Sequence, residues 1–417
     1  MNTTDVVVIG AGVAGLACAA DLQAAGVRVQ VLEASDGVGG RMRSDRVDGF
    51  LIDRGFQVFN TSYPQVRRRL RLRDLRLRPF APGVRVHTSA GGVAAFYDPF
   101  RRPHAPTAST GGPGRSVLSV RDVVALGGMS ARDMLLPASL LKRGADRTTL
   151  AALRRAGFTE EFTEEVLRPF LSGVFLEEGL ETSSRMFHLV WRSMLRGTLC
   201  LPTDGIGAVP RALARALGDG TVRLEAPVDR LTESGVMTAA GTSVPAKAVV
   251  VAAGPRATAS LLPQVEVPEY RSTTTYYHAA PTSPLKEPVL LLDARRRFLN
   301  TCVISEVVPS AAPAHQALVA TSVLGPDGPG REATVREALS AAYGTDTAAW
   351  DLVAVRDIPQ ALPVMTPPHP LSRSTRVEDG RYVCGDHRAT GSVQGAMASG
   401  ARAAREVLRD LARRPRS

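Results

Sequence analysis

The chain has 417 residues, 44% hydrophobic and 22% charged, which are ordinary values for a soluble globular protein with one large core or two. Its longest apolar runs have strand length and are too short to cross a bilayer. A strand is expected to start at Asp5, which leaves no room for a secretory leader and predicts a cytoplasmic protein. The four cysteines are scattered without a Cys/His cluster, which argues against a metal site or a disulfide framework.

The net charge is +11 and is carried almost entirely by arginine. The densest basic stretch runs from Arg67 to Arg78. We expect a solvated helix face there, with Leu70, Leu75 and Leu77 turned inward. Binding to an acidic partner, or peripheral association with an anionic membrane, stays open as the alternative. Nucleic acid is disfavoured because no aromatic residues interleave with the arginines.

The first forty residues read as strand, turn, helix and strand. The strands are expected over 5–9 and 27–33, and an alanine-rich helix over 14–25 ends at Gly26. Residues 101–115 are rich in Pro, Gly, Ser and Thr and are expected to form an exposed loop.

Helical patterns dominate from about residue 120 to 217, and strand patterns follow them. The expected helices are 131–141, 160–171, 184–195 and 209–217. The expected strands are 222–225, 228–231, 236–239, 246–253, 273–279, 289–292, 301–305 and 317–324. A helix is expected over 332–343, and the chain closes with a strand over 381–384, a glycine-rich turn and a helix over 393–412.

A glycine-rich turn follows the first strand. Gly10, Gly12 and Gly15 form the pattern Gly-x-Gly-x-x-Gly between a strand and a helix, the context in which this pattern binds dinucleotides. The helix N-terminus offers free N–H groups to a pyrophosphate, and Glu33, at the end of the second strand, is placed to bind ribose hydroxyls. NAD and FAD share these features, so an NAD-dependent dehydrogenase remains an alternative at this point.

The residues after Glu33 resemble a known family. Residues 32–44 contain Gly39-Gly40-Arg41 and look like the segment that continues the FAD fingerprint in the flavin-containing amine oxidase superfamily. That superfamily includes monoamine oxidases, protoporphyrinogen oxidases and phytoene desaturases. The resemblance implies that Gly39 and Gly40 pass close to the cofactor and that Arg41 lies near its phosphates and flavin end.

A second resemblance lies near the other end of the chain. Residues 382–386 and 391–400 are similar to the closing FAD motif of the superfamily, in which the acid binds the ribityl chain and the next helix points at the flavin pyrimidine. Residues 50–56, 226–231 and 249–255 resemble further cofactor segments. The resemblance implies FAD bound by Gly10, Gly12, Ala14, Gly15, Glu33, Gly39, Gly40, Arg41, Gly55, Phe56, Val228, Gly254, Gly385, Asp386, Val393, Gln394 and Ala396.

The order of these segments predicts an α/β fold with a discontinuous FAD-binding domain of Rossmann type. That domain is expected to comprise residues 1–60, 200–265 and 355–417. An α+β substrate domain, with a mixed sheet and a helical lid, is expected to be inserted as residues 61–199 and 266–354.

Two departures from the superfamily limit the resemblance. Some members tether the flavin through a cysteine near the closing motif, but Cys384 lies within the strand, so we expect non-covalent FAD. Many amine oxidases carry a lysine on the first strand of the substrate sheet, and none occurs over 272–279 here. Weak candidates for groups near the substrate are Tyr276, His278 and His387, and strand alternation places Tyr277 on the other face.

The sequence therefore predicts an FAD-dependent oxidoreductase acting on a small, largely apolar molecule, by amine oxidation or desaturation, with oxygen or a quinone as acceptor. A desaturase or porphyrinogen-oxidase substrate fits better than a simple amine because the lysine is missing. A flavin-dependent isomerase without net redox stays open. A non-catalytic protein of the same fold, resembling prenyl-protein escort proteins, is disfavoured by the complete cofactor motifs.

Overall fold

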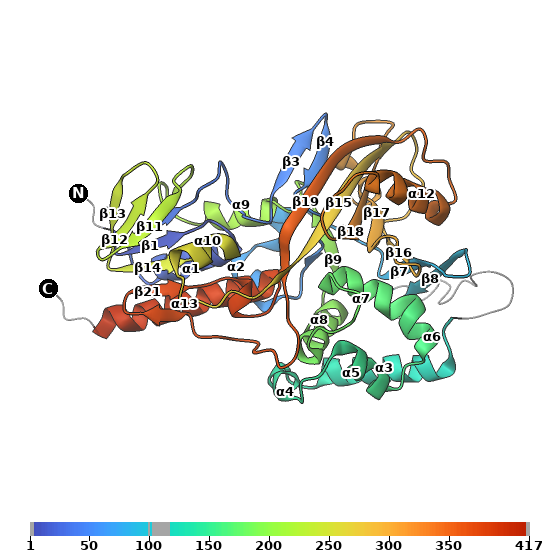
Figure 1. Cartoon of the computed structure of the whole chain (residues 1–417), viewed down its shortest axis with the longest axis horizontal. Coiled ribbons are helices and arrows are strands. Elements are labelled where there is room, and N and C mark those ends of the chain that lie inside the picture. Colours follow the sequence, from blue (N-terminus) through green and yellow to red (C-terminus); the bar gives the residue numbers. More distant parts are fainter. Residues whose placement is uncertain (1–3, 99–100, 102–116, 414–417) are drawn as a thin grey trace.

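The computed structural model describes residues 4–98, 101 and 117–413. It is an elongated α/β structure with one large sheet toward each end (Figure 1). The long antiparallel strands β15 (Tyr270–Ala280) and β19 (Asp351–Pro363) lead from the middle of the molecule into the second sheet. The α/β class predicted from the sequence is confirmed.

The first sheet has six strands in the order β10-β2-β1-β14-β21-β20. Its strand pairs are parallel except β20–β21 at one edge. All four residues of β1 are buried, as expected for a parallel strand covered on both faces. The strands are β1 (Val6–Ile9), β2 (Val29–Leu32), β10 (Val222–Arg223), β14 (Ala248–Val251), β20 (Arg376–Glu378) and β21 (Arg381–Val383).

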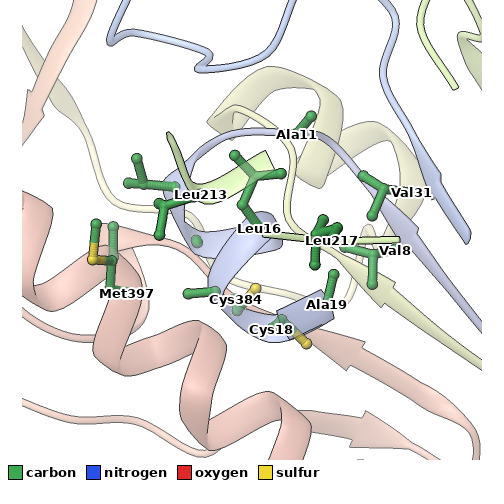
Figure 2. Close-up of a cluster of buried hydrophobic side chains, with 14 of the residues drawn as sticks. Val8, Ala11, Leu16, Cys18, Ala19, Val31, Leu213, Leu217, Cys384 and Met397 are labelled. Atoms are coloured by element: carbon green, nitrogen blue, oxygen red, sulfur yellow. The ribbon is translucent and has the colours of Figure 1, made fainter. Parts of the chain in front are cut away.

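Helices α1 (Val13–Ala24), α9 (Ala208–Arg215) and α13 (Val393–Arg413) cover one face of this sheet. Figure 2 shows Leu16 and Cys18 of α1 in one buried cluster with Leu213, Cys384 and Met397. Helices α1 and α13 approach closely because α13 has a glycine at the crossing. A Cβ at Gly400 would lie 2.1 Å from the carbonyl oxygen of Ala14. The glycine turn after β1 is thus held between two layers.

The other face of the first sheet is covered by a small antiparallel sheet and a short helix. Val7 and Ile9 of β1 pack there with Val236 and Leu262. The covering elements are β11 (Val228–Thr232), β12 (Gly235–Thr238), β13 (Ser243–Pro245) and α10 (Pro255–Leu261).

The second sheet has seven strands in the order β19-β15-β18-β17-β16-β7-β8. Only the β16–β7 pair is parallel among the pairs of this sheet. Helix α12 (Arg331–Tyr343) buries Val335 and Leu339 against Leu291 and Val319 of this sheet. The remaining strands are β7 (Gly83–His87), β8 (Val93–Tyr97), β16 (Leu290–Asp293), β17 (Asn300–Val303) and β18 (Ala317–Leu324).

A group of helices lies beside the second sheet, at the lower right of Figure 1. The expected helix 131–141 is wrong as a single element: α3 ends at Leu135 and α4 begins at Ala138. Leu136 is extended (ψ 141°) because it precedes Pro137. The helices are α3 (Val120–Leu135), α4 (Ala138–Arg143), α5 (Thr149–Ala156), α6 (Glu160–Phe162), a π-helical turn (Thr163–Leu167), α7 (Arg168–Phe175) and α8 (Ser184–Arg196).

Short elements connect these layers, and most were not predicted. The expected strand 301–305 is also too long, because β17 ends at Val303 and Ile304 begins a short helix. The connecting elements are β3 (Ser44–Val47), β4 (Phe50–Asp53), β5 (Phe59–Asn60), β6 (Leu77–Pro79), β9 (Leu199–Pro202), α2 (Pro64–Arg69), α11 (Ile304–Val307) and the 3-10 turns η1 (Leu72–Leu75), η3 (Pro309–Ala311) and η4 (Asp386–Arg388).

The arginine-rich stretch does not form one helix face. Helix α2 ends at Arg69, because Leu70 adopts an extended conformation, and a 3-10 turn and β6 follow. Leu70 and Leu75 are buried, as expected, and Leu77 is half-buried. Arg69 is the arginine of this stretch most enclosed by protein, and it donates two hydrogen bonds to Asp21 at 3.0 and 2.7 Å.

The predicted domain boundaries stay a prediction. The six strands of the first sheet fall within 1–60, 200–265 and 355–417, whereas β19 runs across the expected boundary at residue 355. The expected loop 101–115 lies outside the described residues apart from Arg101. None of the helices in the described part of the chain combines the length and the hydropathy of a membrane span.

Candidate functional site

The glycine turn between β1 and α1 contains glycines of two kinds. A Cβ at Gly10, where φ is +103°, would lie 2.7 Å from the carbonyl oxygen of Ala252, and one at Gly15 would lie 2.1 Å from that of Gly10. These two glycines are required by the packing of the protein itself. Gly12 is different: its φ is −69°, and a Cβ there would meet no protein atom within 4 Å. Its alpha carbon faces open space.

Other glycines border the same region. Gly39 donates its N–H to the carbonyl of Ala11 at 2.9 Å and forms a β-bridge with Gly12. A Cβ at Gly40 would meet only the alpha carbon of Gly12, at 3.7 Å. Gly254 follows β14, the parallel neighbour of β1, and a Cβ there would also meet nothing within 4 Å. The carboxyl ends of β1 and β14 therefore present a glycine-lined cradle.

The N-terminus of α1 opens into this cradle. Gly12 is its N-cap and gives no side-chain cap, and the first turn contains no acidic residue. Leu16 is the residue whose N–H bonds the carbonyl of Gly12, which leaves the N–H groups of Val13, Ala14 and Gly15 without a helical partner. Free N–H groups and the helix dipole favour an anion here.

Glu33 stands at the end of β2, beside the glycine turn. Its Oε2 accepts a hydrogen bond from the N–H of Ala11 at 2.6 Å. Its Oε1 accepts from the N–H and the hydroxyl of Ser35 at 3.0 and 2.7 Å. A carboxylate has about four acceptor positions, so this half-buried carboxylate keeps capacity for ribose hydroxyls.

Two predicted cofactor segments that are far apart in the sequence meet at an ion pair. Arg41 Nη2 lies 2.7 Å from Asp386 Oδ2, and Arg41 Nη1 donates to the carbonyl of Ala361 at 2.6 Å. The hydroxyl of Tyr270 donates to Asp386 Oδ1 at 3.2 Å, and the guanidinium carbon lies 5.7 Å from the centre of its ring. The structure thus brings Gly39-Gly40-Arg41 and Gly385-Asp386 together.

Sequence reasoning missed Tyr270 and Gln57 at this place. Gln57 donates its side-chain amide to the carbonyl of Arg41 at 2.7 Å. Tyr270 begins β15, three residues before the predicted start of that strand. An aromatic residue at a strand end gives no signal of a hydrogen bond to a carboxylate that is distant in the sequence. Only the long β15–β19 ladder places it there.

His387 is buried beside Asp386, and its Nε2 has no hydrogen-bond partner among the described residues. Burial lowers the pKa of His387 to about 4, with the charge of Asp386 opposing the shift. The imidazole is therefore neutral at pH 7. It offers one polar atom to a neighbour but does not act as a cation.

The start of α13 contains three of the predicted cofactor residues, Val393, Gln394 and Ala396. The hydroxyl of Ser392 accepts from the N–H of Gly395 at 3.0 Å and so caps the helix. Gln394 directs its side chain to α2, where its Oε1 accepts from the N–H of Gln65 at 2.9 Å. Ala396 is buried and Val393 is half-buried. The Oε1 of Gln394 is therefore engaged within the protein.

One face of β15 meets residues 53–56. The N–H of Phe56 donates to the hydroxyl of Thr275 at 3.3 Å, and Tyr277 donates to the carbonyl of Asp53 at 2.9 Å. Asp53 Oδ1 accepts from the Ser44 hydroxyl at 2.6 Å and from the N–H of Ile206 at 3.0 Å. Burial nevertheless raises the pKa of Asp53 to about 6.

The other face of β15 carries Tyr276 and His278. Tyr276 donates to Asp327, and His278 Nε2 lies 2.8 Å from Glu332 and packs near Trp350. The predicted alternation is confirmed, since Tyr277 lies on the opposite face. Asp327, Glu332 and Trp350 lie outside the predicted cofactor segments.

Two further residues considered from the sequence lie in or beside a strand: Val228 is half-buried in β11, and Cys384 follows directly after β21. Val228 pairs with Thr238 in the β11–β12 hairpin. Cys384 is fully buried in the cluster of Figure 2, and burial raises the pKa of its thiol to about 12. All four cysteines of the chain are buried and free.

A separate cavity of about 920 Å³ lies among α3, α4, α5 and α8. None of the predicted cofactor residues lines it. Its walls are largely apolar and its edge is basic.

The site has the features of a dinucleotide-binding α/β protein: a glycine turn, an uncapped helix N-terminus and an acid at the end of the second strand. Comparison with known families is more specific. The family of flavin-containing amine oxidoreductases matches residues 13–408. The chain belongs to this family, which implies a flavin cofactor.

Individual relatives agree with the family. The chain is 31% identical over 256 residues to a zeta-carotene-forming phytoene desaturase of Myxococcus xanthus; the match covers 55% of this chain and 48% of that protein. The matched part thus spans about half of this relative's length. The fold is similar to that of a putrescine oxidase variant (TM-score 0.70, 18% identity, 98% of this chain and 99% of that one). It is also similar to cyclohexylamine oxidase from Brevibacterium oxydans (TM-score 0.67, 18% identity, 99% and 100%).

Proposed function

We propose that this protein is an oxidoreductase that holds FAD non-covalently and oxidises a small, largely apolar molecule, by amine oxidation or by desaturation. The observation that carries the proposal is that Gly12 and Gly254, where a Cβ would meet no protein atom within 4 Å, border the same region as Gly40 and the Arg41–Asp386 pair. Packing within the protein does not require a glycine at position 12. A ligand that approaches the backbone does.

The residues fit a flavin dinucleotide in chemical terms. The free N–H groups at the start of α1 suit a pyrophosphate, and the spare acceptor capacity of Glu33 suits ribose hydroxyls. Asp386 and the unpartnered Nε2 of His387 add polar groups on the side toward β15. We assign the seventeen residues named from the sequence to this cofactor.

Retention of the cofactor is proposed to be non-covalent. Cys384 is the cysteine nearest the closing motif in sequence, but its sulfur is fully buried within the core and its thiol remains protonated at neutral pH. A thioether at this position would require the core around α1 to open. Binding through hydrogen bonds and charge is therefore the favoured mode.

When bound, the flavin accepts a hydride from the substrate at its N5 position. The protein positions the substrate and excludes water. We assign Tyr277 and Thr275 to the substrate side of the flavin, because they lie on the face of β15 that meets Phe56. They replace Tyr276 and His278, which lie on the opposite face. The hydroxyls of Tyr277 and Thr275 already have partners in the protein, so neither is proposed to act as a base. Oxygen or a quinone would receive the electrons afterwards.

The test is direct. Purified protein should be yellow, and acid or heat should release free FAD. Amines, polyenes and porphyrinogens added anaerobically should then be screened for bleaching of the flavin absorbance. A colourless protein that cannot be reconstituted with FAD would refute the proposal. Conversion of a substrate in the absence of any acceptor would indicate an isomerase instead.

A further inference from the structure

Helix α3 exposes a row of aliphatic side chains to solvent, while Ala125 and Met129 of the same helix pack in the hydrophobic core. Val120, Val124 and Leu135 are 83%, 69% and 82% exposed, and Val123 is 52% exposed. The acidic residues of this helix, Asp122 and Asp133, are fully buried instead. Soluble helices usually show the reverse pattern, with polar residues outside. Isolated exposed aliphatic side chains need no explanation, but a contiguous helix face does.

The buried acids of α3 have partners within the protein. Asp122 accepts hydrogen bonds from Ser119 and Thr159, and Asp133 lies 2.7 Å from His188. They anchor α3 to its neighbours and fix the helix with its aliphatic row outward. The orientation of this row is therefore built into the packing.

The helices that flank this face add only positive charge. Helices α4 and α5 contain no acidic residue, and Leu140 of α4 is 51% exposed. Together, α3, α4 and α5 expose aliphatic side chains among six cations and no acid. The six exposed cations are Arg121, Arg132, Lys142, Arg143, Arg154 and Arg155.

The cavity of about 920 Å³ opens on the same side. Its walls include Val124, Gly128 and Ala156, and its edge carries Arg121, Arg132 and Arg155, which are exposed. An apolar groove with cations at its rim suits an amphipathic anion, in which a hydrocarbon chain ends in a negative group.

We propose that α3, α4 and α5 dock on the surface of an anionic lipid bilayer, with the exposed valines and leucines inserted at the headgroup level and the six cations on the phosphates. The groove would receive part of a lipid acyl chain. This surface, at the lower right of Figure 1, lies on different elements from the Arg67–Arg78 stretch that the charge pattern first indicated. Interfacial helices bind membranes through this combination of aliphatic and basic side chains.

Charge decides against a second copy of the chain. A two-fold symmetric contact would place the six cations of one molecule against the same six of the other. An acidic protein partner is less favoured than a bilayer, because the exposed apolar side chains are aliphatic. Protein interfaces concentrate their binding energy in aromatic anchors, which this face lacks among its exposed large apolar residues.

The test uses the full chain and co-sedimentation with vesicles. The protein should bind vesicles of phosphatidylcholine mixed with phosphatidylglycerol, should bind vesicles of phosphatidylcholine alone much more weakly, and should be released by salt. Val124→Asp and Leu135→Asp should each lower vesicle affinity about tenfold. Exchange of Arg132, Lys142 and Arg143 for glutamine should lower it roughly fivefold per residue.

Matched controls separate this surface from general effects. Leu352→Asp, at a position 43% exposed on β19, should leave vesicle binding unchanged, as should Arg71→Gln with Arg73→Gln in the arginine-rich stretch. All the substituted positions are exposed, and unchanged circular dichroism would show that the fold is intact. Equal binding to neutral and anionic vesicles would overturn the proposal. So would a dimer in sedimentation velocity that Val124→Asp dissociates.

Discussion

Arg41 and Asp386 are 345 positions apart in sequence, and their side chains form an ion pair of 2.7 Å at the carboxyl ends of the first sheet. The arginine side chain is 39% exposed, whereas the carboxylate is 7% exposed. Arg41 therefore compensates the buried negative charge of Asp386 at Oδ2. The other carboxylate oxygen, Oδ1, accepts hydrogen bonds from the hydroxyl of Tyr270 at 3.2 Å and from the N–H of His387 at 3.0 Å.

The first prediction concerns this pair. Arg41→Ala should lower the free energy of unfolding without FAD by about 1–3 kcal/mol, since it leaves the buried carboxylate without its cation. Asp386→Asn should cost less, because arginine can turn toward solvent. A double-mutant cycle in urea unfolding measures the coupling. Equal and additive losses would show that the two side chains do not interact in solution.

The second prediction concerns Glu33. Glu33→Ala should weaken FAD binding by roughly 2–4 kcal/mol through the loss of charge-assisted ribose hydrogen bonds. The protein without FAD should also lose about 1 kcal/mol of stability, because the carboxylate holds Ala11 and Ser35. Ser35→Ala is the control: it removes one partner of the carboxylate and should leave FAD affinity nearly unchanged. Titration of apoprotein with FAD measures both. Full retention of FAD by the alanine variant would exclude Glu33 as the ribose ligand.

The third prediction is a pH dependence set by Asp53. Its pKa in the folded protein is raised to about 6, so the folded state holds a proton that the unfolded state has already released. This contribution to stability is present in full below the ordinary pKa of 3.8 and is lost as the pH rises through about 6. The free energy of unfolding of the wild-type protein should therefore fall by about 2 kcal/mol between pH 4 and 7 because of Asp53. This fall should be absent in Asp53→Asn.

Asp45 provides a control of opposite sign for that measurement. Its hydrogen bond to Arg54 holds its pKa below the ordinary value. Asp45→Asn should remove stability that is present above the ordinary pKa and lost as the pH falls. If both variants shift the pH profile in the same direction, the burial of Asp53 is not the cause.

The pattern of apolar residues in the sequence made much of the first sheet predictable. Val6–Ile9 and Ala248–Val251 are continuous apolar runs, and both form parallel strands with every residue buried. Strand β19 was missed because its 13 residues include Pro359, Arg356 and Asp357. It lies at the edge of its sheet, where a proline removes no necessary hydrogen bond. Edge position is a property of the assembled sheet.

The candidate site was predictable where glycines and acidic residues follow a fixed spacing. It was less predictable where the hydrogen-bond partner of a side chain depends on the tertiary structure. The sequence assigned Gln394 to the cofactor site and gave no sign that its amide oxygen also accepts from the N–H of Gln65 at 2.9 Å. Tyr270 was not expected, and it bonds Asp386. Both contacts depend on long-range packing of α13 against α2 and of β15 against β19, which local pattern does not encode.

The fourth prediction concerns oxygen. No lysine stands on β15, and Thr275 uses its hydroxyl to accept from Phe56. His387 is neutral at pH 7, so it does not replace the missing cation. Because superoxide formation is favoured beside a positive charge, the reduced enzyme should reoxidise slowly in air and faster with a quinone. Stopped-flow absorbance measures both rates. Faster reoxidation by air than by quinone would show that Arg41 or another cation suffices.

The fifth prediction separates the role of Gly12 in the fold from its role toward the cofactor. Gly12→Ala should leave the stability of the protein without FAD unchanged, because φ is −69° and the new methyl meets no protein atom within 4 Å. FAD affinity should nevertheless fall by about 1–3 kcal/mol, the usual cost of an extra methyl in a filled site. Gly15→Ala should instead destabilise the apoprotein, since its methyl would lie 2.1 Å from the oxygen of Gly10. Gly127→Ala is a control on α3, where a Cβ would also meet nothing within 4 Å. This substitution should leave FAD affinity unchanged. Unchanged FAD affinity in Gly12→Ala would mean that the cofactor does not approach this turn.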